Sequence, residues 1–268
     1  MPELPEVETV RRQLEPRLPG RTVLEAGSHP SAKFTPATEV TDATFGSMGR
    51  RGKFLLLSTT DGRELVVHLG MTGQLRFGGP EPQLDDPYLR AWWRLDDRTT
   101  LEFADVRRFG RLRVVPAGDY RDIPTLHVAG PEPWDPALTP KRFHASIKAS
   151  KRAIKTQLLS QRPVAGVGNI YADEALWAAE VNPKVTRLGL DRAERLLEEV
   201  RAALERGLDG GGTTLRDYRN VDGGTGENQH RLAAYGRAGQ PCLRCGTELT
   251  SAVIDARTTT WCPTCQRR

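Results

Sequence analysis

The chain has 268 residues, a length that fits one large domain or two medium ones. Hydrophobic residues make up 38% of it, yet no apolar run approaches the roughly 20 residues of a membrane span. The formal net charge of +5 favours a polyanionic partner without defining a fold. No signal-peptide pattern follows the N-terminus, so we expect a soluble intracellular protein that does not act at a membrane.

The N-terminal segment reads MPELPE. Removal of the initiator Met would leave Pro2 as a secondary amine, and α-amino groups have a pKa of about 7.7–8.0. A neutral amine can form a Schiff base, with the Glu3 carboxyl beside it as proton donor or acceptor. The plainer interpretation is that Pro2 only starts a helix and that Glu3 and Glu6 favour its dipole. On these six residues alone, the plainer interpretation is preferred.

A helix is predicted over Val7–Leu14, where apolar residues fall on one face. Short segments of strand character separated by turn signals follow it and predict an antiparallel sandwich or barrel. The polar, proline-rich stretch 78–87 is predicted to be an exposed loop. The predicted strands are Thr22–Ala26, Lys53–Thr60, Glu64–Leu69, Gln74–Phe77, Leu89–Leu95, Thr100–Phe103 and Arg111–Val115.

A change of character near residue 130 indicates a domain linker, because residues 130–134 read GPEPW. A helical pattern covers Pro140–Gln161, with a basic face that carries six positive charges and no acid, Lys155 among them. Such a run is usually solvated, but this one favours contact with phosphate. The turn Gly166–Tyr171 can present backbone N–H groups to an anion, or simply join two helices.

A further helix is predicted over Asp191–Leu208, with Asp191 and Glu194 spaced as a capping box. The polar, glycine-rich stretch Thr213–His230 follows it and is long enough to be a functional or mobile loop.

The C-terminus carries all four cysteines, in two Cys-x2-Cys pairs sixteen residues apart. This spacing matches a four-thiolate site for one structural zinc ion, because four protein ligands leave no open position for water. A redox dithiol is a weaker interpretation, since it would not need a second pair. Arg257 lies between the pairs and is either a phosphate-binding residue or a solvated loop arginine. The zinc ligands are Cys242, Cys245, Cys262 and Cys265.

Two central turns hold residue types that suit insertion into a base stack. The first is 68–73, HLGMTG, in which His68 and Met71 are otherwise ordinary structural residues. The second is 105–110, DVRRFG, which is otherwise a hairpin with an ion pair to Asp105.

Together these motifs resemble the formamidopyrimidine-DNA glycosylases, which are related to the endonuclease VIII type. Any one of these motifs could occur by chance, but their joint order along the chain is specific for this family. Leu4 favours the oxidised-purine branch, since the endonuclease VIII type usually has glycine there. The motifs that carry the resemblance are residues 2–9, 51–53, 68–73, 105–110, 166–174, 211–214 and 235–237, with the four cysteines.

The resemblance implies catalytic roles for four residues. Pro2 would attack C1′ of the damaged nucleoside, Glu3 would transfer protons, Lys53 would contact phosphate and assist elimination, and Arg257 would assist the second elimination. Met71, Arg107 and Phe109 would fill the gap left by an everted nucleotide. The implied phosphate-binding residues are His68, Tyr88, Lys151, Asn169, Tyr235 and Arg257.

The implied fold is α+β and multidomain. It comprises an N-terminal antiparallel β-sandwich with an N-terminal helix (1–130), a helix-two-turn-helix domain with the lesion loop (131–228), and a zinc-bound β-hairpin (229–268). The implied activity is excision of oxidised purines from duplex DNA, followed by β- and δ-elimination. A monomer in the bacterial cytoplasm, associated with the nucleoid through DNA, is expected.

Two departures from the family pattern leave alternatives open. The loop at 223–230 has no aromatic residue, and Tyr88 stands where relatives often place a DNA-contacting histidine. An oxidised-pyrimidine glycosylase of the endonuclease VIII type is one alternative. A non-catalytic DNA-damage-binding protein is the other, and intact Pro2, Glu3 and Lys53 argue against it.

Overall fold

The computed structural model describes residues 1–267, which group into two compact units. The first unit comprises Met1–His127 and Gly210–Gln229. The second comprises Val128–Asp209 and the chain from His230 onward. The stretch after the long helix of the second unit thus returns to the first. The division into three domains stays a prediction.

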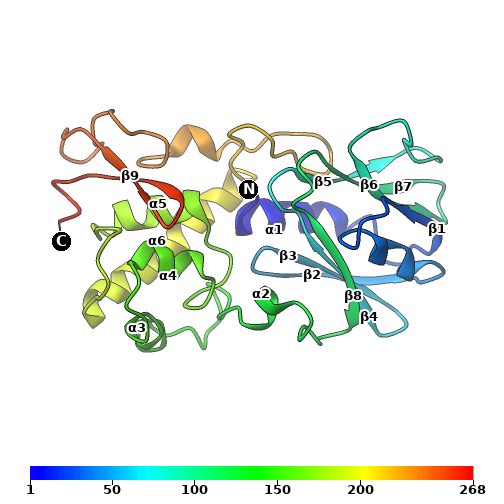
Figure 1. Ribbon diagram of the computed structural model, residues 1–268, viewed down its shortest axis with the longest axis horizontal. Helices are drawn as coiled ribbons and strands as arrows, with labels where there is room; N and C mark the ends of the chain where they lie inside the picture. The colour runs from blue at the N-terminus through cyan, green and yellow to red at the C-terminus, as the bar shows by residue number, and fades with distance from the viewer. Residues whose placement is uncertain (268) are drawn as a thin grey trace. The chain divides into compact units, whose positions relative to one another are not determined.

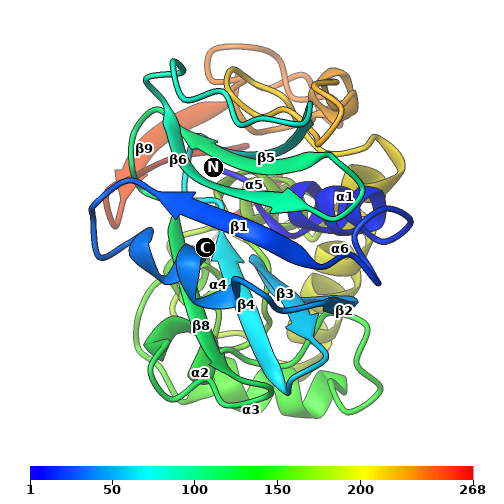
Figure 2. The ribbon, with the colours of Figure 1, turned by 90° about the vertical axis from the view of Figure 1, so that its right-hand side faces the viewer.

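The first unit is a sandwich of two four-stranded antiparallel sheets, which Figure 2 shows one above the other. One sheet has the order β1-β6-β7-β5 and the other β2-β3-β4-β8. The strands are β1 Val23–Ser28, β2 Phe45–Arg51, β3 Phe54–Thr59, β4 Arg63–His68, β5 Gly73–Gly78, β6 Leu89–Leu95, β7 Thr100–Asp105 and β8 Arg111–Pro116.

Helix α1 (Leu4–Leu14) completes the core of this sandwich. Its apolar face, Val7, Val10 and Leu14, is buried in one cluster with side chains from both sheets, such as Trp93 of β6 and Leu57 of β3. Burial of such side chains contributes about 1.5–3 kcal/mol each. Helix α1 therefore holds the N-terminal segment with Pro2 against the core of the sandwich. Two short helices also pack on the sheets: η1 (Thr35–Val40) contacts β1, β6 and β8, and Leu126 of α2 (Pro124–His127) packs with Val66 and Val115.

The second unit packs four helices together with a C-terminal hairpin (Figure 1). Helix α5 contacts α4, α6 and the hairpin, so it is the central element of the unit. The helices are α3 Pro140–Lys148, α4 Ile154–Leu159, α5 Asn169–Ala178 and α6 Leu190–Asp209. The hairpin is β9 Thr250–Ile254 and β10 Arg257–Trp261, and η2 (Asn228–Arg231) precedes it in the chain.

The structure corrects three details of the predicted elements. Strand β2 was not predicted, and the single pattern over 140–161 is two helices with a break between Lys148 and Ile154. Helix α6 begins at Leu190, so Asp191 lies inside its first turn and is not the N-cap of a capping box. In the described part of the chain, no helix is long and apolar enough to cross a membrane.

Candidate active site and nucleic-acid interface

The capping box of this chain lies at its N-terminus, not at α6. Glu3 is the N-cap of α1, its carboxylate accepts from the Glu6 backbone, and its own N–H donates to Glu6 Oε2 at 2.7 Å. Pro2, Glu3 and Glu6 are all buried. The structure gives a well-formed helix start with Glu6 in the first turn, but Pro2 precedes the N-cap Glu3 and is not part of the helix. The helix start also holds the predicted nucleophile and the predicted proton carrier in one fixed geometry, as catalysis requires.

Glu6 joins this helix start to the glycine-rich loop at 210–229. Its Oε1 accepts the Thr213 N–H at 2.7 Å, and its backbone carbonyl accepts from the Tyr218 hydroxyl at 3.4 Å. Burial, followed by the nearby Glu6 charge, raises the pKa of Tyr218. The sequence analysis named Glu6 only as a residue that favours the helix dipole, and it missed the bond to Thr213. A carboxylate in a first helical turn ordinarily has no other role. The position of Glu6 next to Pro2-Glu3 was the available signal.

The loop itself is anchored to the first unit. Tyr218 and Val221 are buried in the sandwich core. Gln13 accepts the Val221 N–H at 2.9 Å and donates to Asp222 at 3.1 Å, and Arg17 pairs with Asp222 at 3.0 Å. The arginine also lies 3.6 Å from the Phe77 ring centroid. The loop is thus bonded to the first unit at these points, and its exposed residues include 215–217 and 222–225.

Lys53 lies in the turn that precedes β3, not in the predicted strand, and His68 ends the neighbouring strand β4. Lys53 immediately precedes Phe54, which is the register partner of His68, and the two rings lie 4.7 Å apart. Burial lowers the pKa of His68 to about 4, assisted by the positive charges of Lys53 and Arg111. The Gly70 N–H donates to His68 Nδ1 at 3.2 Å. The neutral ring therefore carries its proton on Nε2, where it can donate to a phosphate.

The two turns that carry the predicted inserting residues lie side by side. The Thr72 hydroxyl donates to Asp105 Oδ1 at 2.5 Å and accepts the Arg107 N–H at 3.0 Å. A Cβ on Gly70, whose φ is +65°, would lie 2.4 Å from the Gly110 nitrogen, so only glycine allows this approach. Asp105 Oδ2 accepts the Gly110 N–H at 2.7 Å.

Arg107 and Phe109 project from these turns. Both are exposed, and the Arg107 guanidinium lies 5.0 Å from the Phe109 ring centroid. Met71 is half-buried on the neighbouring turn. The structure thus brings these three predicted residues onto one pair of joined turns.

A polar cavity of about 520 Å³ opens next to these turns. Tyr88 and Arg107 both line this cavity, together with Arg216 and Arg219 of the anchored loop. Its lining carries four arginines and three aspartates, and Arg76 is paired with Asp86. The lining residues are Thr72, Gln74, Arg76, Asp86, Tyr88, Ala104, Asp105, Val106, Arg107, Arg216, Asp217 and Arg219.

The second unit holds the other predicted phosphate-binding residues. Asn169 begins α5 and donates to the Thr258 carbonyl on β10 at 3.2 Å, next to exposed Arg257. Lys151 is exposed between α3 and α4. The Tyr235 N–H donates to Glu174 Oε1 at 2.8 Å, so helix α5 positions that segment as well.

Lys155 does not belong to the basic face that the sequence predicted to contact phosphate. Its side chain is fully buried, pairs with Asp173 at 2.6 Å, and donates to Thr259 Oγ1 at 2.9 Å. Asp173 in turn accepts the Thr260 N–H at 3.0 Å. Burial raises the pKa of Asp173 to about 6, against the attraction of Lys155. The pair fixes β10, which begins at Arg257, onto α5, and Asp173 was missed because its partners are far away in the sequence.

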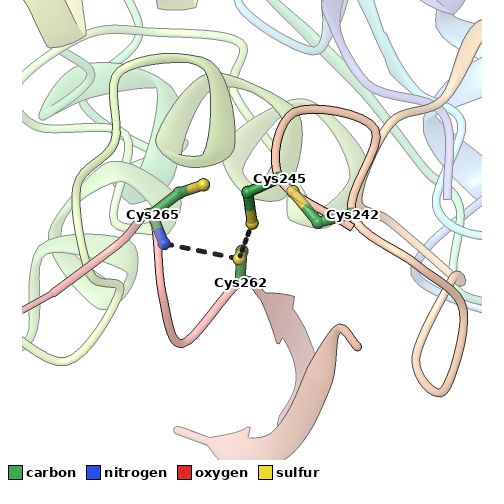
Figure 3. Close-up of side chains that lie close together, drawn as sticks. All are labelled: Cys242, Cys245, Cys262 and Cys265. Carbon is green, nitrogen blue, oxygen red and sulfur yellow. Dashed lines mark hydrogen bonds between the residues drawn. The ribbon is translucent and has the colours of Figure 1, made fainter. Parts of the chain in front are cut away.

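The four cysteines form one cluster, in which their side chains point toward one another (Figure 3). All four sulfur atoms lie within 4.8 Å of one another, and Cys245 and Cys262 are 3.6 Å apart. A tetrahedral zinc ion with Zn–S bonds of about 2.3 Å requires sulfurs about 3.8 Å apart. The donor set and spacing therefore fit one structural Zn²⁺, as predicted.

A sandwich that fixes an N-terminal Pro-Glu pair, a helical unit and a four-cysteine hairpin define a DNA glycosylase of the helix-two-turn-helix class. Three family models match the chain. They are described as formamidopyrimidine-DNA glycosylase N-terminal domain (residues 1–112), formamidopyrimidine-DNA glycosylase H2TH domain (129–219) and zinc finger found in FPG and IleRS (239–268). The chain belongs to the formamidopyrimidine-DNA glycosylase family.

Individual relatives agree with this assignment over nearly their full length. The chain is 42% identical to the formamidopyrimidine-DNA glycosylase of Deinococcus radiodurans over 279 residues, which cover 99% of this chain and 97% of that protein. The crystal structure of the Fpg protein from Thermus thermophilus matches with a TM-score of 0.91 and 45% identity, covering 99% and 98% of the two chains. A Lactococcus lactis Fpg variant, solved in complex with DNA that contains Fapy-dG, matches with a TM-score of 0.88 and 33% identity over both full chains.

Proposed function

We propose that this chain is a bifunctional DNA glycosylase and AP lyase, which excises oxidised purines from duplex DNA and cleaves the abasic strand. The observation that best supports this proposal is the buried Glu3–Glu6 capping box. It fixes the N-terminal segment that contains Pro2, and Glu6 also binds the loop at 210–229 through the Thr213 N–H. Family membership supplies the substrate class. Solved Lactococcus lactis Fpg structures contain Fapy-dG DNA and abasic-site DNA. Residue roles and localisation are parts of this proposal.

The proposed chemistry begins when Met1 is removed and Pro2 presents its secondary amine. The amine attacks C1′ and displaces the base, which leaves with a proton. The C1′–O4′ bond then breaks, and an iminium forms between C1′ and the nitrogen. Glu3 transfers protons during sugar-ring opening. The iminium acidifies C2′–H, so loss of that proton expels the 3′ phosphate, and a second elimination expels the 5′ phosphate. Lys53 and Arg257 assist these eliminations by binding the phosphates. No catalytic metal or redox cofactor enters this scheme.

The damaged nucleotide has to leave the base stack before Pro2 can reach C1′. Everting a nucleotide costs a few kcal/mol, and less for a damaged base, and DNA glycosylases are known users of this strategy. Met71, Arg107 and Phe109 fill the vacated space, supported by the two joined turns. The anchored loop at 210–229 then covers the extruded base.

Phosphate binding by both units accounts for the positive net charge of the chain. His68 and Tyr88 serve in the first unit. Lys151, Asn169, Tyr235 and Arg257 serve in the second. We further propose a monomer in the bacterial cytoplasm that associates with the nucleoid through its DNA substrate.

Borohydride trapping tests the proposal directly. The full chain is mixed with duplexes that carry 8-oxoguanine, an oxidised pyrimidine or an abasic site, and mass spectrometry locates the adduct. The expected result is a Pro2 adduct on the 8-oxoguanine and abasic duplexes. An adduct on the pyrimidine lesion in place of 8-oxoguanine would assign the endonuclease VIII specificity. DNA binding without any adduct would leave the non-catalytic alternative.

The variant Pro2→Gly separates binding from chemistry. It removes the proposed secondary amine, so we expect DNA binding to remain while borohydride trapping falls to background. Arg12→Ala is a matched control, because Arg12 is exposed on α1 and pairs with Glu8. Full trapping by Pro2→Gly, at the control's level, would refute the assignment of the nucleophile.

A further inference from the structure

Helix α5 makes a direct contact with the zinc site through its last turn. Trp177 lies in that turn, and its indole N–H donates to Cys242 Sγ at 3.3 Å. The Trp177 ring also packs on the small apolar cluster that contains Cys242, Leu249 and Cys262. An indole N–H can only donate, so the sulfur is the acceptor in this contact.

Arg244, between the first two cysteines, reinforces the same contact. Its guanidinium lies 4.6 Å from the Trp177 ring centroid and donates to the carbonyls of Trp177 and Ala178, each at 3.2 Å. Carbonyls at the end of a helix have no partner within the helix, so a cation there is stabilising. The segment 242–245 is thus bound to the last turn of α5 through both Cys242 and Arg244.

The contact with Trp177 affects the charge and the reactivity of a zinc ligand. Four thiolates around one Zn²⁺ carry an excess of negative charge, and sulfur is then both a ligand and a nucleophile. Hydrogen bonds to a ligating atom orient it and stabilise its charge, and their removal typically costs 10–100-fold in metal affinity. A donor aimed at the Cys242 sulfur therefore withdraws electron density from that sulfur in particular.

We propose that Trp177 is a positioning residue of the zinc centre. Its N–H holds the Cys242 thiolate for the metal, makes that sulfur less reactive than it would otherwise be, and joins metal retention to the helix that begins at Asn169. This role is separate from excision and does not depend on the proposed nucleophile.

Trp177→Phe in the zinc-loaded full chain tests the proposal. Phenylalanine keeps an aromatic ring but removes the donor, so zinc affinity, measured by competition with a chromogenic chelator, should fall about 10–100-fold. Trp134→Phe is the matched control, because its N–H donates to Glu205 at 2.8 Å in the same unit and not to a sulfur. Equal zinc affinity in the two variants would overturn the proposal.

Two further readouts distinguish the hydrogen bond from simple packing. In the Co²⁺-substituted protein, the sulfur-to-cobalt charge-transfer bands should move to lower energy in Trp177→Phe, because the sulfur lone pairs lose their donor. In the zinc-loaded protein, N-ethylmaleimide should modify Cys242 several-fold faster, with Cys262 and Cys265 unchanged. Unshifted cobalt bands, or an equal rise at every cysteine, would refute the proposal.

A second variant covers the case in which Trp177→Phe does not fold. Incorporation of 3-benzothienylalanine at position 177 keeps the bicyclic shape and replaces the N–H with sulfur. Faster alkylation of Cys242 and shifted cobalt bands in this protein would support the proposal. Behaviour identical to the wild type would show that ring shape alone is sufficient, and would overturn it.

Discussion

His68 shows how one residue's environment determines its protonation. Burial, together with the positive charges of Lys53 and Arg111, lowers its pKa to about 4, whereas an unfolded histidine has a pKa of about 6.5. Between these values the unfolded chain binds the additional proton, so folding stability rises with pH. The contribution is fully present above about pH 6.5 and is lost as the pH falls toward 4.

The resulting prediction concerns stability at mildly acidic pH. Replacing His68 with Gln should flatten the pH dependence of the free energy of unfolding between pH 4.5 and 7 by up to about 3 kcal/mol, since one pKa unit corresponds to about 1.4 kcal/mol. Urea unfolding of both proteins across this range measures the difference. Other titrating groups, Asp173 included, are common to both proteins and cancel. Parallel curves would show that His68 titrates normally in the fold.

The Lys155–Asp173 pair is a second prediction at the residue scale. Asp173→Asn leaves a fully buried ammonium without its counter-ion, which should cost about 3–5 kcal/mol of the free energy of unfolding. The Arg152–Asp255 pair in the same unit is exposed, so Asp255→Asn should cost less than about 1 kcal/mol. Urea denaturation followed by tryptophan fluorescence compares the two. Equal losses would mean that the buried pair is not a structural support.

At the scale of elements, the anchored loop is the feature most closely tied to the site. Gln13 contacts both Val221 and Asp222, so Gln13→Ala should loosen the loop without changing the core. We expect faster hydrogen exchange at 220–226 and several-fold slower excision of 8-oxoguanine. Cleavage of a preformed abasic site, which needs no base recognition, should change little. Exchange mass spectrometry and single-turnover assays measure these effects.

The control for this loop experiment is again Arg12→Ala, one residue away on the same helix, whose guanidinium pairs with Glu8. Its loop exchange and excision rate should match the wild type. An equal decrease of both activities in Gln13→Ala would show that the loop serves the catalytic terminus as a whole, not base recognition.

The same elements show what the sequence could reveal and what it could not. Strands with alternating or apolar patterns, such as Leu89–Leu95, were predicted to the residue. Strand β2 was missed because its sequence, FGSMGRR, has two glycines and no β-branched residue. The break between α3 and α4 was missed because apolar spacing continues through it. The spacing of apolar residues predicts which face of a helix is buried, but it does not predict where the helix breaks.

The site divides along similar lines. Zinc ligands were predictable because their spacing is local, and the structure places their sulfurs together. The turns at 68–73 and 105–110 were recognisable one by one, but their junction through Thr72 and Asp105 depends on strand pairing far along the chain. Lys155 was misjudged because a buried lysine is expected only with a partner, and its partner Asp173 lies on another helix.

At the scale of the whole molecule, removal of zinc should affect the second unit and spare the first. The cysteine cluster belongs to the second unit, while the sandwich core with α1 and the loop belongs to the first. A module as short as the hairpin cannot build a core of its own, so metal binding supplies its folding free energy. Cys262→Ser, or chelation of the metal, should therefore unfold the hairpin and leave the sandwich folded.

Hydrogen exchange and DNA binding together test this prediction. We expect protection to disappear in 239–267 and to persist in β3 and β4, and affinity for lesion duplex to fall below detection because β10 carries Arg257. Thr264→Ala is a control between the last two cysteines, since its hydroxyl forms an exposed hydrogen bond with the Thr247 side chain and is not a zinc ligand. If metal-free protein kept its affinity, phosphate binding by the rest of the chain would suffice. If the sandwich also lost protection, the units would not fold independently, and the metal would support the catalytic terminus as well.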